Sequence, residues 1–180
     1  DLVGHIDQLT QAQWRADDSQ ILTASDDGTV RVWDAVEGAQ PAGELPMLAR
    51  HSGRISRLLW NATGDLVLSA GLDDGTVKIV EAQNGEELIT LAGHNKGIND
   101  VRWNQHEDRV LTASADGTAR IWDVATGQEQ WQVQHAKQIF SAAWSPDETM
   151  ILTASEDRSA MIWDATTGKA LRMLRGHGNG

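Results

Sequence analysis

The chain has 180 residues, of which 40% are hydrophobic and 23% charged, a balance typical of a soluble globular domain with a sizeable core. Acidic residues outnumber basic ones 26 to 15 and no basic run is present, so the net charge of −11 argues against nucleic-acid binding and favours basic or neutral partners. No stretch approaches the ~18 apolar residues that a membrane helix needs, and the lack of cysteine excludes disulfides and thiolate chemistry.

A repeat runs along the whole chain, and each copy begins near a histidine. The spacings are 46, 43, 41 and 42 residues between His5, His51, His94, His135 and His177. Each of the first four histidines is followed nine residues later by a tryptophan, namely Trp14, Trp60, Trp103 and Trp144. This period predicts four units, at about 5–50, 51–93, 94–134 and 135–176, with His177 starting a fifth.

A second common segment follows in each unit. It reads LTASDDGTVRVWD at 22–34, LSAGLDDGTVKIVE at 68–81, LTASADGTARIWD at 111–123 and LTASEDRSAMIWD at 152–164. In the third unit, runs at 98–103, 108–114, 118–123 and 129–133 are separated by turn residues, which predicts four short strands. Asp-Gly before an alternating run is typical of a tight hairpin, because glycine accepts positive φ. The chain is therefore predicted to be all-β.

A repeat of this length, with Gly-His near its start and Trp-Asp after its third strand, resembles the WD-repeat β-propeller family. The resemblance covers essentially the whole chain and implies a β-propeller segment with four blades, each a four-stranded antiparallel sheet. In that family each blade has a structural tetrad of hydrogen-bonded His, Ser or Thr, Asp and Trp. By position, the implied tetrads are His5, Ser25, Asp27 and Trp33; His94, Ser114, Asp116 and Trp122; and His135, Ser155, Asp157 and Trp163.

Two units depart from this pattern. In the second unit His51 and Asp74 remain, but Val80 and Glu81 replace Trp-Asp and one extra residue precedes Asp74, so an incomplete tetrad is predicted. Either apolar packing and the neighbouring blades hold this blade, or it is a softer blade used in recognition. In the fourth unit Arg158 stands where the other units have glycine, which predicts a turn of a different type.

The serine, aspartate and histidine of each unit also suggest a catalytic triad. An enzyme usually needs one such set beside an oxyanion site, whereas this chain repeats the set, which favours a structural role. The histidines at the start of the units are at least 41 residues apart, which is no metal-ligand spacing. We therefore expect no catalytic, cofactor-binding or metal-binding residues and no enzymatic activity.

The resemblance further implies where a partner binds. In relatives, partner-facing positions lie three and five residues after the first histidine and just before the tetrad aspartate. The side chains at these positions are Gln8, Thr10, Asp26, Arg54, Ser56, Asp73, Asn99, Gln138, Phe140 and Glu156. An exposed aromatic near arginine and carboxylates is typical of a binding hot spot, so Phe140 is the main candidate, unless a neighbouring blade covers it. The alternative binding regions are the outer strands and the Pro-containing segment 35–48.

We expect a cytoplasmic, non-catalytic scaffold whose partner is a protein or peptide rather than nucleic acid or a membrane. Two other functions stay open: a sensor or regulatory segment of a bacterial signalling protein, and an enzyme that uses Asp26, Asp73 and Glu156 at the mouth of the channel. Four blades leave two uncovered flanks, which soluble proteins avoid. We therefore expect either a segment of a longer protein, or two copies that form a homo-oligomer and close an eight-blade ring. The chain begins with Asp1 rather than Met, so we expect that it was processed or cut from a longer protein.

Overall fold

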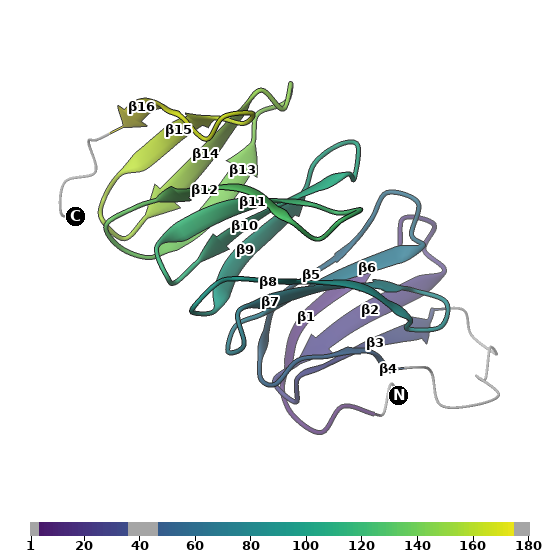
Figure 1. Ribbon diagram of the computed structural model, residues 1–180. Helices are drawn as coiled ribbons and strands as arrows, with labels where there is room; N and C mark the ends of the chain where they lie inside the picture. Colours follow the sequence, from purple (N-terminus) through teal and green to yellow (C-terminus); the bar gives the residue numbers. More distant parts are fainter. Residues whose placement is uncertain (1–3, 36–46, 175–180) are drawn as a thin grey trace. The chain divides into compact units, whose positions relative to one another are not determined.

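The computed structural model describes residues 4–35 and 47–174, and these residues form strands and no helix (Figure 1). Within the described residues there are four antiparallel sheets of four strands each, as the repeat predicts, and each sheet is one blade. The chain divides into an N-terminal unit, Asp1–Ala92, and a C-terminal unit, Gly93–Gly180, and each is described by itself. His177 and most of the segment 35–48 lie outside the described residues.

The N-terminal unit contains blades 1 and 2. Blade 1 consists of β1 (Leu9–Trp14), β2 (Gln20–Ser25), β3 (Thr29–Asp34) and β4 (Met47–Arg50). Blade 2 consists of β5 (Ile55–Trp60), β6 (Leu66–Gly71), β7 (Thr76–Glu81) and β8 (Glu87–Ala92). Strands that follow one another in the sequence pair with one another in both blades. The hairpin turns use Gly28 and Gly75 at φ of 78° and 67°, as Asp-Gly predicts.

The C-terminal unit contains blades 3 and 4, with the same strand order. Blade 3 consists of β9 (Ile98–Trp103), β10 (Arg109–Ser114), β11 (Thr118–Asp123) and β12 (Glu129–Gln134). Blade 4 consists of β13 (Ile139–Trp144), β14 (Met150–Ser155), β15 (Ala160–Asp164) and β16 (Ala170–Leu174). No described segment forms a helix of the length and apolarity required to cross a membrane.

The turn between β14 and β15 corrects the prediction for the fourth unit. Arg158 has a φ of 70°, in the left-handed region that Gly117 occupies in the matching turn of blade 3. The amide of Arg158 donates to the Ser155 carbonyl at 3.2 Å, and that of Gly117 donates to the Ser114 carbonyl at 3.2 Å. The two turns are therefore of the same type. Arginine accepts the conformation, at a cost of about 1–3 kcal/mol, because the hydrogen bonds around Asp157 fix the turn.

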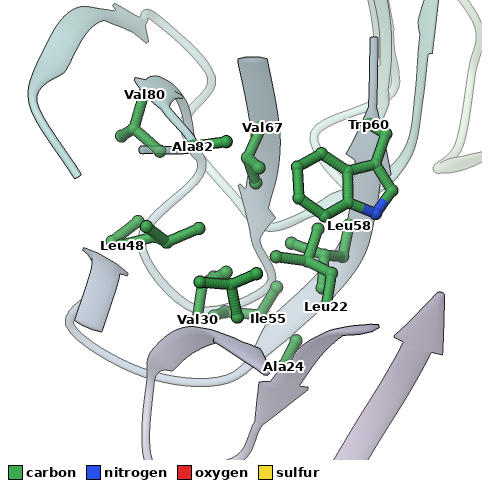
Figure 2. Close-up of a cluster of buried hydrophobic side chains, with 12 residues drawn as sticks. Leu22, Ala24, Val30, Leu48, Ile55, Leu58, Trp60, Val67, Val80 and Ala82 are labelled. Atoms are coloured by element: carbon green, nitrogen blue, oxygen red, sulfur yellow. The ribbon is translucent and has the colours of Figure 1, made fainter. Parts of the chain in front are cut away.

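An apolar core fills the space between the two blades of each unit. In the N-terminal unit Leu22 of β2 and Leu58 of β5 are fully buried, with Val67 and Val80 in the same cluster (Figure 2). In the C-terminal unit, which follows the same pattern, the core comprises Leu111, Ala113, Ala119, Ile121, Val133, Ile139, Ala142, Ile151, Trp163 and Ala165. Trp131 of β12 packs against this core and donates its indole Nε1 to the Ala165 carbonyl at 3.1 Å, so it acts as a packing residue.

A polar side chain of the first strand also ties the two blades of each unit together. The Nε2 of Gln11 in β1 donates to the Leu58 carbonyl at 3.0 Å, and its Oε1 accepts from the Leu58 amide at 2.9 Å. Asp100 holds the same repeat position in β9, where it accepts from Ser141 Oγ at 3.0 Å and from the Ala142 amide at 3.4 Å. These bonds satisfy backbone groups on the otherwise unpaired edge of the second blade.

Candidate functional site

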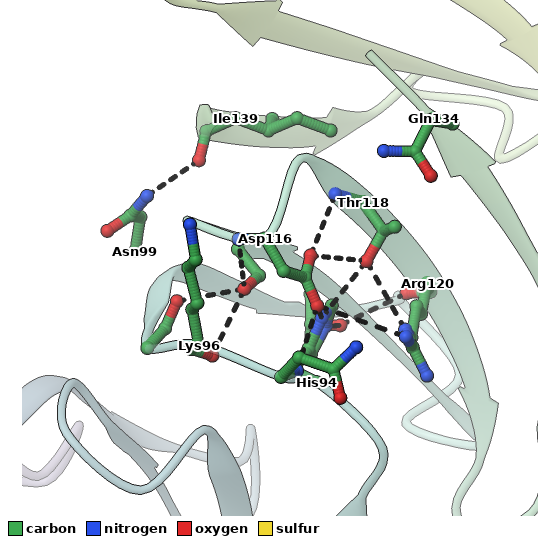
Figure 3. A network of polar contacts seen from close by, with 12 residues as sticks. His94, Lys96, Asn99, Asp116, Thr118, Arg120, Gln134 and Ile139 are labelled. Carbon is green, nitrogen blue, oxygen red and sulfur yellow. Dashed lines mark hydrogen bonds and ion pairs between the residues drawn. The ribbon is translucent and has the colours of Figure 1, made fainter. Parts of the chain in front are cut away.

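A buried polar chain in blade 3 joins the loop before the blade to its third strand. The Nε1 of Trp122 donates to Thr112 Oγ1 at 2.9 Å, and Thr112 Oγ1 lies 2.7 Å from His94 Nε2. His94 Nδ1 lies 2.9 Å from Asp116 Oδ2 (Figure 3). When His94 carries its proton on Nδ1, each contact is a donor–acceptor pair running from Trp to Thr to His to Asp. The four side chains therefore satisfy one another.

Blades 1 and 4 contain the same series of polar contacts. Its Trp–Thr, Thr–His and His–Asp distances are 2.7, 2.8 and 3.1 Å for Trp33, Thr23, His5 and Asp27. They are 2.8, 2.7 and 2.9 Å for Trp163, Thr153, His135 and Asp157. The histidines, aspartates and tryptophans implied by the resemblance are thus brought together in all three blades.

In these three blades the hydroxyl of the tetrad comes from threonine, which corrects the assignment of Ser25, Ser114 and Ser155. Ser114 ends β10, two residues after Thr112. Its Oγ donates to the Gly97 carbonyl at 2.9 Å and accepts from the Asp116 amide at 3.0 Å.

Ser25 and Ser155 likewise accept from the amides of Asp27 and Asp157, each at 3.1 Å. The serines therefore shape the hairpin turns, whereas the threonines lie deeper in the strands and within reach of the indoles. The two hydroxyl residues lie on one face of the strand, so residue type alone did not separate them.

Burial and hydrogen bonding set the charges within the tetrads. Burial lowers the pKa of His94, so its imidazole is neutral at pH 7. Burial would raise the pKa of Asp116, but hydrogen bonds from Thr118 and His94 outweigh it and lower the pKa to about 2. The tetrad of blade 3 thus combines a neutral histidine with an ionised aspartate. Asp27 and Asp157 have pKa values lowered by the same kinds of hydrogen bond, against the effect of burial.

Blade 2 has an incomplete tetrad, as predicted. His51 Nδ1 lies 3.0 Å from Asp74 Oδ2, and its Nε2 lies 2.9 Å from Ser69 Oγ. The tryptophan position is taken by Val80, which is 1% exposed and belongs to the N-terminal core. Apolar packing thus replaces the indole in this blade, which favours the packing interpretation over a softer recognition blade.

The tetrads are not arranged for catalysis. The side chains of Thr112 and Ser114 are fully buried, and their hydroxyls are already hydrogen-bonded. A nucleophile requires an accessible hydroxyl beside a base and a site for the reacting carbonyl. Across the part of the chain that the structure describes, no group of three or more His, Asp or Glu residues is placed to hold a metal ion. The tetrads act as internal ties.

The predicted partner-facing residues of the N-terminal unit lie at the edge where β1 and β5 begin and β2 and β6 end. They are Gln8, Thr10, Asp26, Arg54, Ser56 and Asp73. Arg54 and Asp73 form a two-point ion pair, with Nη2–Oδ1 at 3.0 Å and Nε–Oδ2 at 3.2 Å. The hydrogen bond to Asp73 raises the pKa of Arg54, and the charge of Asp26 adds to this shift. Ser56 instead donates to the Ala70 carbonyl of its own sheet at 3.1 Å, whereas Gln8 and Thr10 are exposed.

The C-terminal unit has a corresponding edge that carries Phe140. Phe140 is 50% exposed, so no described blade covers its ring. Glu156 accepts from Lys137 Nζ at 3.2 Å and from Gln138 Nε2 at 3.1 Å, and these bonds lower its pKa. Asn99 donates to the Ile139 carbonyl at 2.8 Å and so joins blade 3 to blade 4.

Sequence reasoning missed Lys137 at this edge. Lys137 comes two residues after His135, in the loop that the family resemblance already marks, and its charge opposite Glu156 is the signal that could have identified it.

Comparison with known proteins agrees with this architecture. A family model described as "WD domain, G-beta repeat" matches residues 1–34, 44–81, 85–123 and 128–164. The chain is 35% identical over 78 residues to the F-box-like/WD repeat-containing protein TBL1X of Mus musculus, a match covering 43% of this chain and 14% of that protein. It is 36% identical over 72 residues to Coronin-7 of Homo sapiens, covering 40% of this chain and 8% of that protein. The matches thus span only a small part of these relatives, whereas the family model matches most of this chain, which belongs to the WD40 family of WD-repeat proteins.

Proposed function

We propose that this chain is a non-catalytic scaffold for protein–protein interaction. The observation that carries the proposal is Phe140, a half-exposed aromatic at the same edge as the Lys137–Glu156 ion pair. An aromatic side chain that a partner desolvates, surrounded by polar groups, is the usual composition of an interface hot spot. Membership of the WD40 family and the rigid, internally tied blades support the same function.

The ion pair Arg54–Asp73 extends the proposal to the N-terminal unit. Both side chains are about half exposed, at 54% and 41%, so a partner can reach them without opening the fold. Their charges are already paired, which favours a protein or peptide of mixed character over a polyanion. A sensor or regulatory segment of a larger signalling protein would bind its partner at the same edges. It would differ from a scaffold only in the domains to which the blades are joined.

An enzyme at the edge of either unit is disfavoured by the state of the carboxylates there. The hydrogen bonds from Arg54 lower the pKa of Asp73, and the bond from Lys137 lowers the pKa of Glu156. A general acid at neutral pH needs a carboxyl pKa raised toward 7, which is the opposite direction.

The proposal is tested with peptides selected from a random phage-displayed library on the immobilised chain. The double variant Phe140→Ala/Arg54→Ala should bind the selected peptides at least about tenfold more weakly, without a lower melting temperature. Leu88→Ala is the matched control, because Leu88 is 48% exposed on the outer strand β8 and belongs to neither set of edge residues. If the double variant keeps full affinity, the edges are not the binding surface.

We also propose that copies of the chain associate through the free faces of blades 1 and 4. Leu111, Ala113 and Ile121 of blade 3 are fully buried in the C-terminal core, whereas their repeat equivalents in blade 4 are more open, with Leu152 42% exposed. Blade 1 has the complementary opening, since Leu9 is 59% exposed while its equivalent Ile139 is fully buried. Each free face thus has the composition of a face that another blade covers within this chain, which supports head-to-tail closure.

A further inference from the structure

A cavity of about 580 Å³ lies between blades 1 and 2 of the N-terminal unit. Its position is where β1, β3 and β7 end and β2 and β6 begin, opposite the edge that carries Arg54 and Asp73. The lining residues come from both blades: Arg15, Gln20, Val32 and Asp34 from blade 1, and Gly64, Asp65, Leu66, Glu81, Ala82 and Gln83 from blade 2. The volume is within the range of pockets that bind small ligands or single side chains.

Gly64 lines the cavity with backbone alone, and the side chain of Arg15 lies against it. Gly64 comes four residues after Trp60, and Glu148 holds the same place in blade 4, four residues after Trp144. In the C-terminal unit Glu148 reaches across to blade 3, where it accepts from Asn104 Nδ2 at 3.1 Å.

Both turns have positive φ, at 74° for Gly64 and 56° for Glu148, so the backbone is the same and only the side chain differs. In the C-terminal unit the side chain of Glu148 occupies this position, whereas in the N-terminal unit Arg15 packs against the bare backbone of Gly64.

Arg15 forms one wall of the cavity and its charge is already engaged. Its Nη1 donates to Gln20 Oε1 at 3.0 Å, and its Nε lies 3.6 Å from Asp17 Oδ2. The guanidinium also lies 5.9 Å from the centroid of the Trp60 ring. These contacts hold Arg15 between blade 1 and Trp60 of blade 2, beside Gly64, where a Cβ would come within 2.6 Å of the arginine Nε.

The lining carries more negative than positive charge. Asp34, Asp65 and Glu81 stand against the single guanidinium of Arg15. Asp34 accepts from Gln20 Nε2 at 3.2 Å and Glu81 accepts from Asn84 Nδ2 at 3.1 Å, which leaves lone pairs on both carboxylates for a ligand.

Apolar side chains complete the lining of the cavity, namely Val32, Leu66 and Ala82. A ligand with a cationic head and an apolar stem matches this combination of carboxylates and apolar wall.

We propose that this cavity binds a basic side chain of a peptide partner, and that arginine fits it best. The planar guanidinium pairs with carboxylates at two points and is more weakly hydrated than an ammonium, so it loses less on entering a half-apolar cavity than lysine does. The net charge of −11 attracts such a partner at long range.

The test uses the blocked tripeptide acetyl-Ala-Arg-Ala-amide and ¹⁵N-labelled full chain, with backbone amide shifts as the readout. We expect the amides of Gly64, Leu66 and Ala82 to shift on titration, and the matching peptide with neutral citrulline to bind about tenfold more weakly. The affinity for the matching lysine peptide should lie between those for the arginine and citrulline peptides. Equal affinity for the arginine and citrulline peptides would overturn the proposal, as would shifts confined to other residues.

Variants separate the cavity from the general charge of the chain. The double variant Asp34→Asn/Glu81→Gln should bind the arginine peptide about tenfold more weakly. The control Asp18→Asn/Glu86→Gln removes the same charge from exposed side chains of the same unit that do not line the cavity, and it should bind like the wild type. An equal loss of affinity in both double variants would mean that the peptide responds to the overall charge of the chain and does not bind in the cavity.

Filling the cavity gives a second readout that leaves the carboxylates in place. Gly64→Gln places a neutral side chain where Glu148 stands in blade 4. The flexible end of Arg15 must move aside for its Cβ, and the variant should abolish the arginine-dependent shifts while the chain stays folded. Unchanged binding by Gly64→Gln would contradict the proposal. Phe140→Ala/Arg54→Ala should not affect this peptide, so failure of this proposal and failure of the scaffold proposal are distinguishable.

Discussion

The Oγ1 atom of Thr112 is the point where the indole of Trp122 and the imidazole of His94 meet. It accepts from the first at 2.9 Å and lies 2.7 Å from the second. The Nε2 of a neutral His94 accepts a hydrogen bond from the Thr112 hydroxyl. The hydrogen bonds therefore all run in one direction, from Trp122 to Asp116. Truncation of any one member leaves buried polar groups without partners, at about 1–3 kcal/mol each.

Trp122→Ala should therefore destabilise the fold far more than Trp131→Ala. Trp122 is 3% exposed, and its loss combines a large cavity with an unpaired Thr112 hydroxyl, or about 3–5 kcal/mol in the free energy of unfolding. Trp131 is half-buried and its Nε1 bonds a single carbonyl, so about half that loss is expected. Denaturant unfolding of both variants measures the difference, and equal losses would contradict the tetrad at Trp122.

The pKa of Asp116 predicts how stability depends on acid. Its folded-state pKa of about 2 lies below the ordinary value of 3.8, so it contributes about 2 kcal/mol of stability above pH 4 that is lost as the pH falls toward 2. The pKa of His94 is lowered from 6.5, so protonation of the unfolded chain already reduces stability below about pH 6.5.

Asp116→Asn should therefore lower the free energy of unfolding at pH 7 and flatten its decline between pH 4 and pH 2. Denaturant titrations across this range measure both effects. An undiminished slope in the variant would show that Asp116 does not carry this part of the acid sensitivity.

At the scale of the strand, the alternation of the sequence and its Asp-Gly turns were sufficient to predict the blades. The runs predicted at 98–103 and 118–123 match β9 and β11, and the runs at 108–114 and 129–133 differ from β10 and β12 by one residue at one end. Such segments are predictable because each is fixed by local patterning and a turn of known preference.

The remaining differences concern features that local patterning does not determine. Thr112 and Ser114 carry the same hydroxyl on one face of β10, and only the distance to Trp122 separates them. Arg158 adopts the glycine conformation because the turn around it is fixed by other bonds. The bond from Asn99 to the neighbouring blade was not predicted, because it depends on packing between blades.

Blade 2 permits a test of whether its missing tryptophan is a loss or a replacement. Val80 is 1% exposed inside a closely packed cluster, so Val80→Trp should destabilise the chain by about 1–3 kcal/mol through overpacking, although it supplies an indole near Ser69. The variant Val80→Ile serves as the control, because it adds only one methylene at the same site and should destabilise the chain less than Val80→Trp. A stabilised Val80→Trp variant would instead mean that the site has kept room for the indole.

For the whole molecule, the free apolar faces of blades 1 and 4 predict association. Each matches a face that another blade buries elsewhere in the chain, as Leu152 matches Leu111 and Leu9 matches Ile139. We expect a mass in solution above the 19.6 kDa of one chain, with a dimer that closes eight blades as the main species.

Leu152→Lys should shift this equilibrium toward the single chain with little change in its unfolding, because Leu152 is already 42% exposed. Sedimentation equilibrium measures the mass, and Leu88→Lys, at 48% exposure on β8, is the control that should keep the wild-type mass. A wild-type chain that is monomeric at all concentrations would contradict head-to-tail closure.

The bond between Gln11 and the backbone of Leu58 has a consequence for how the N-terminal unit can be observed. The amide hydrogen of Leu58 is held by a side chain of blade 1 rather than by a strand of its own sheet. Its exchange with deuterated solvent therefore requires blade 1 to move away from blade 2, even while every strand pairing of blade 2 stays intact. Comparison of its exchange rate with those of amides inside the β5–β6 ladder would measure the opening between two blades separately from the unravelling of either one.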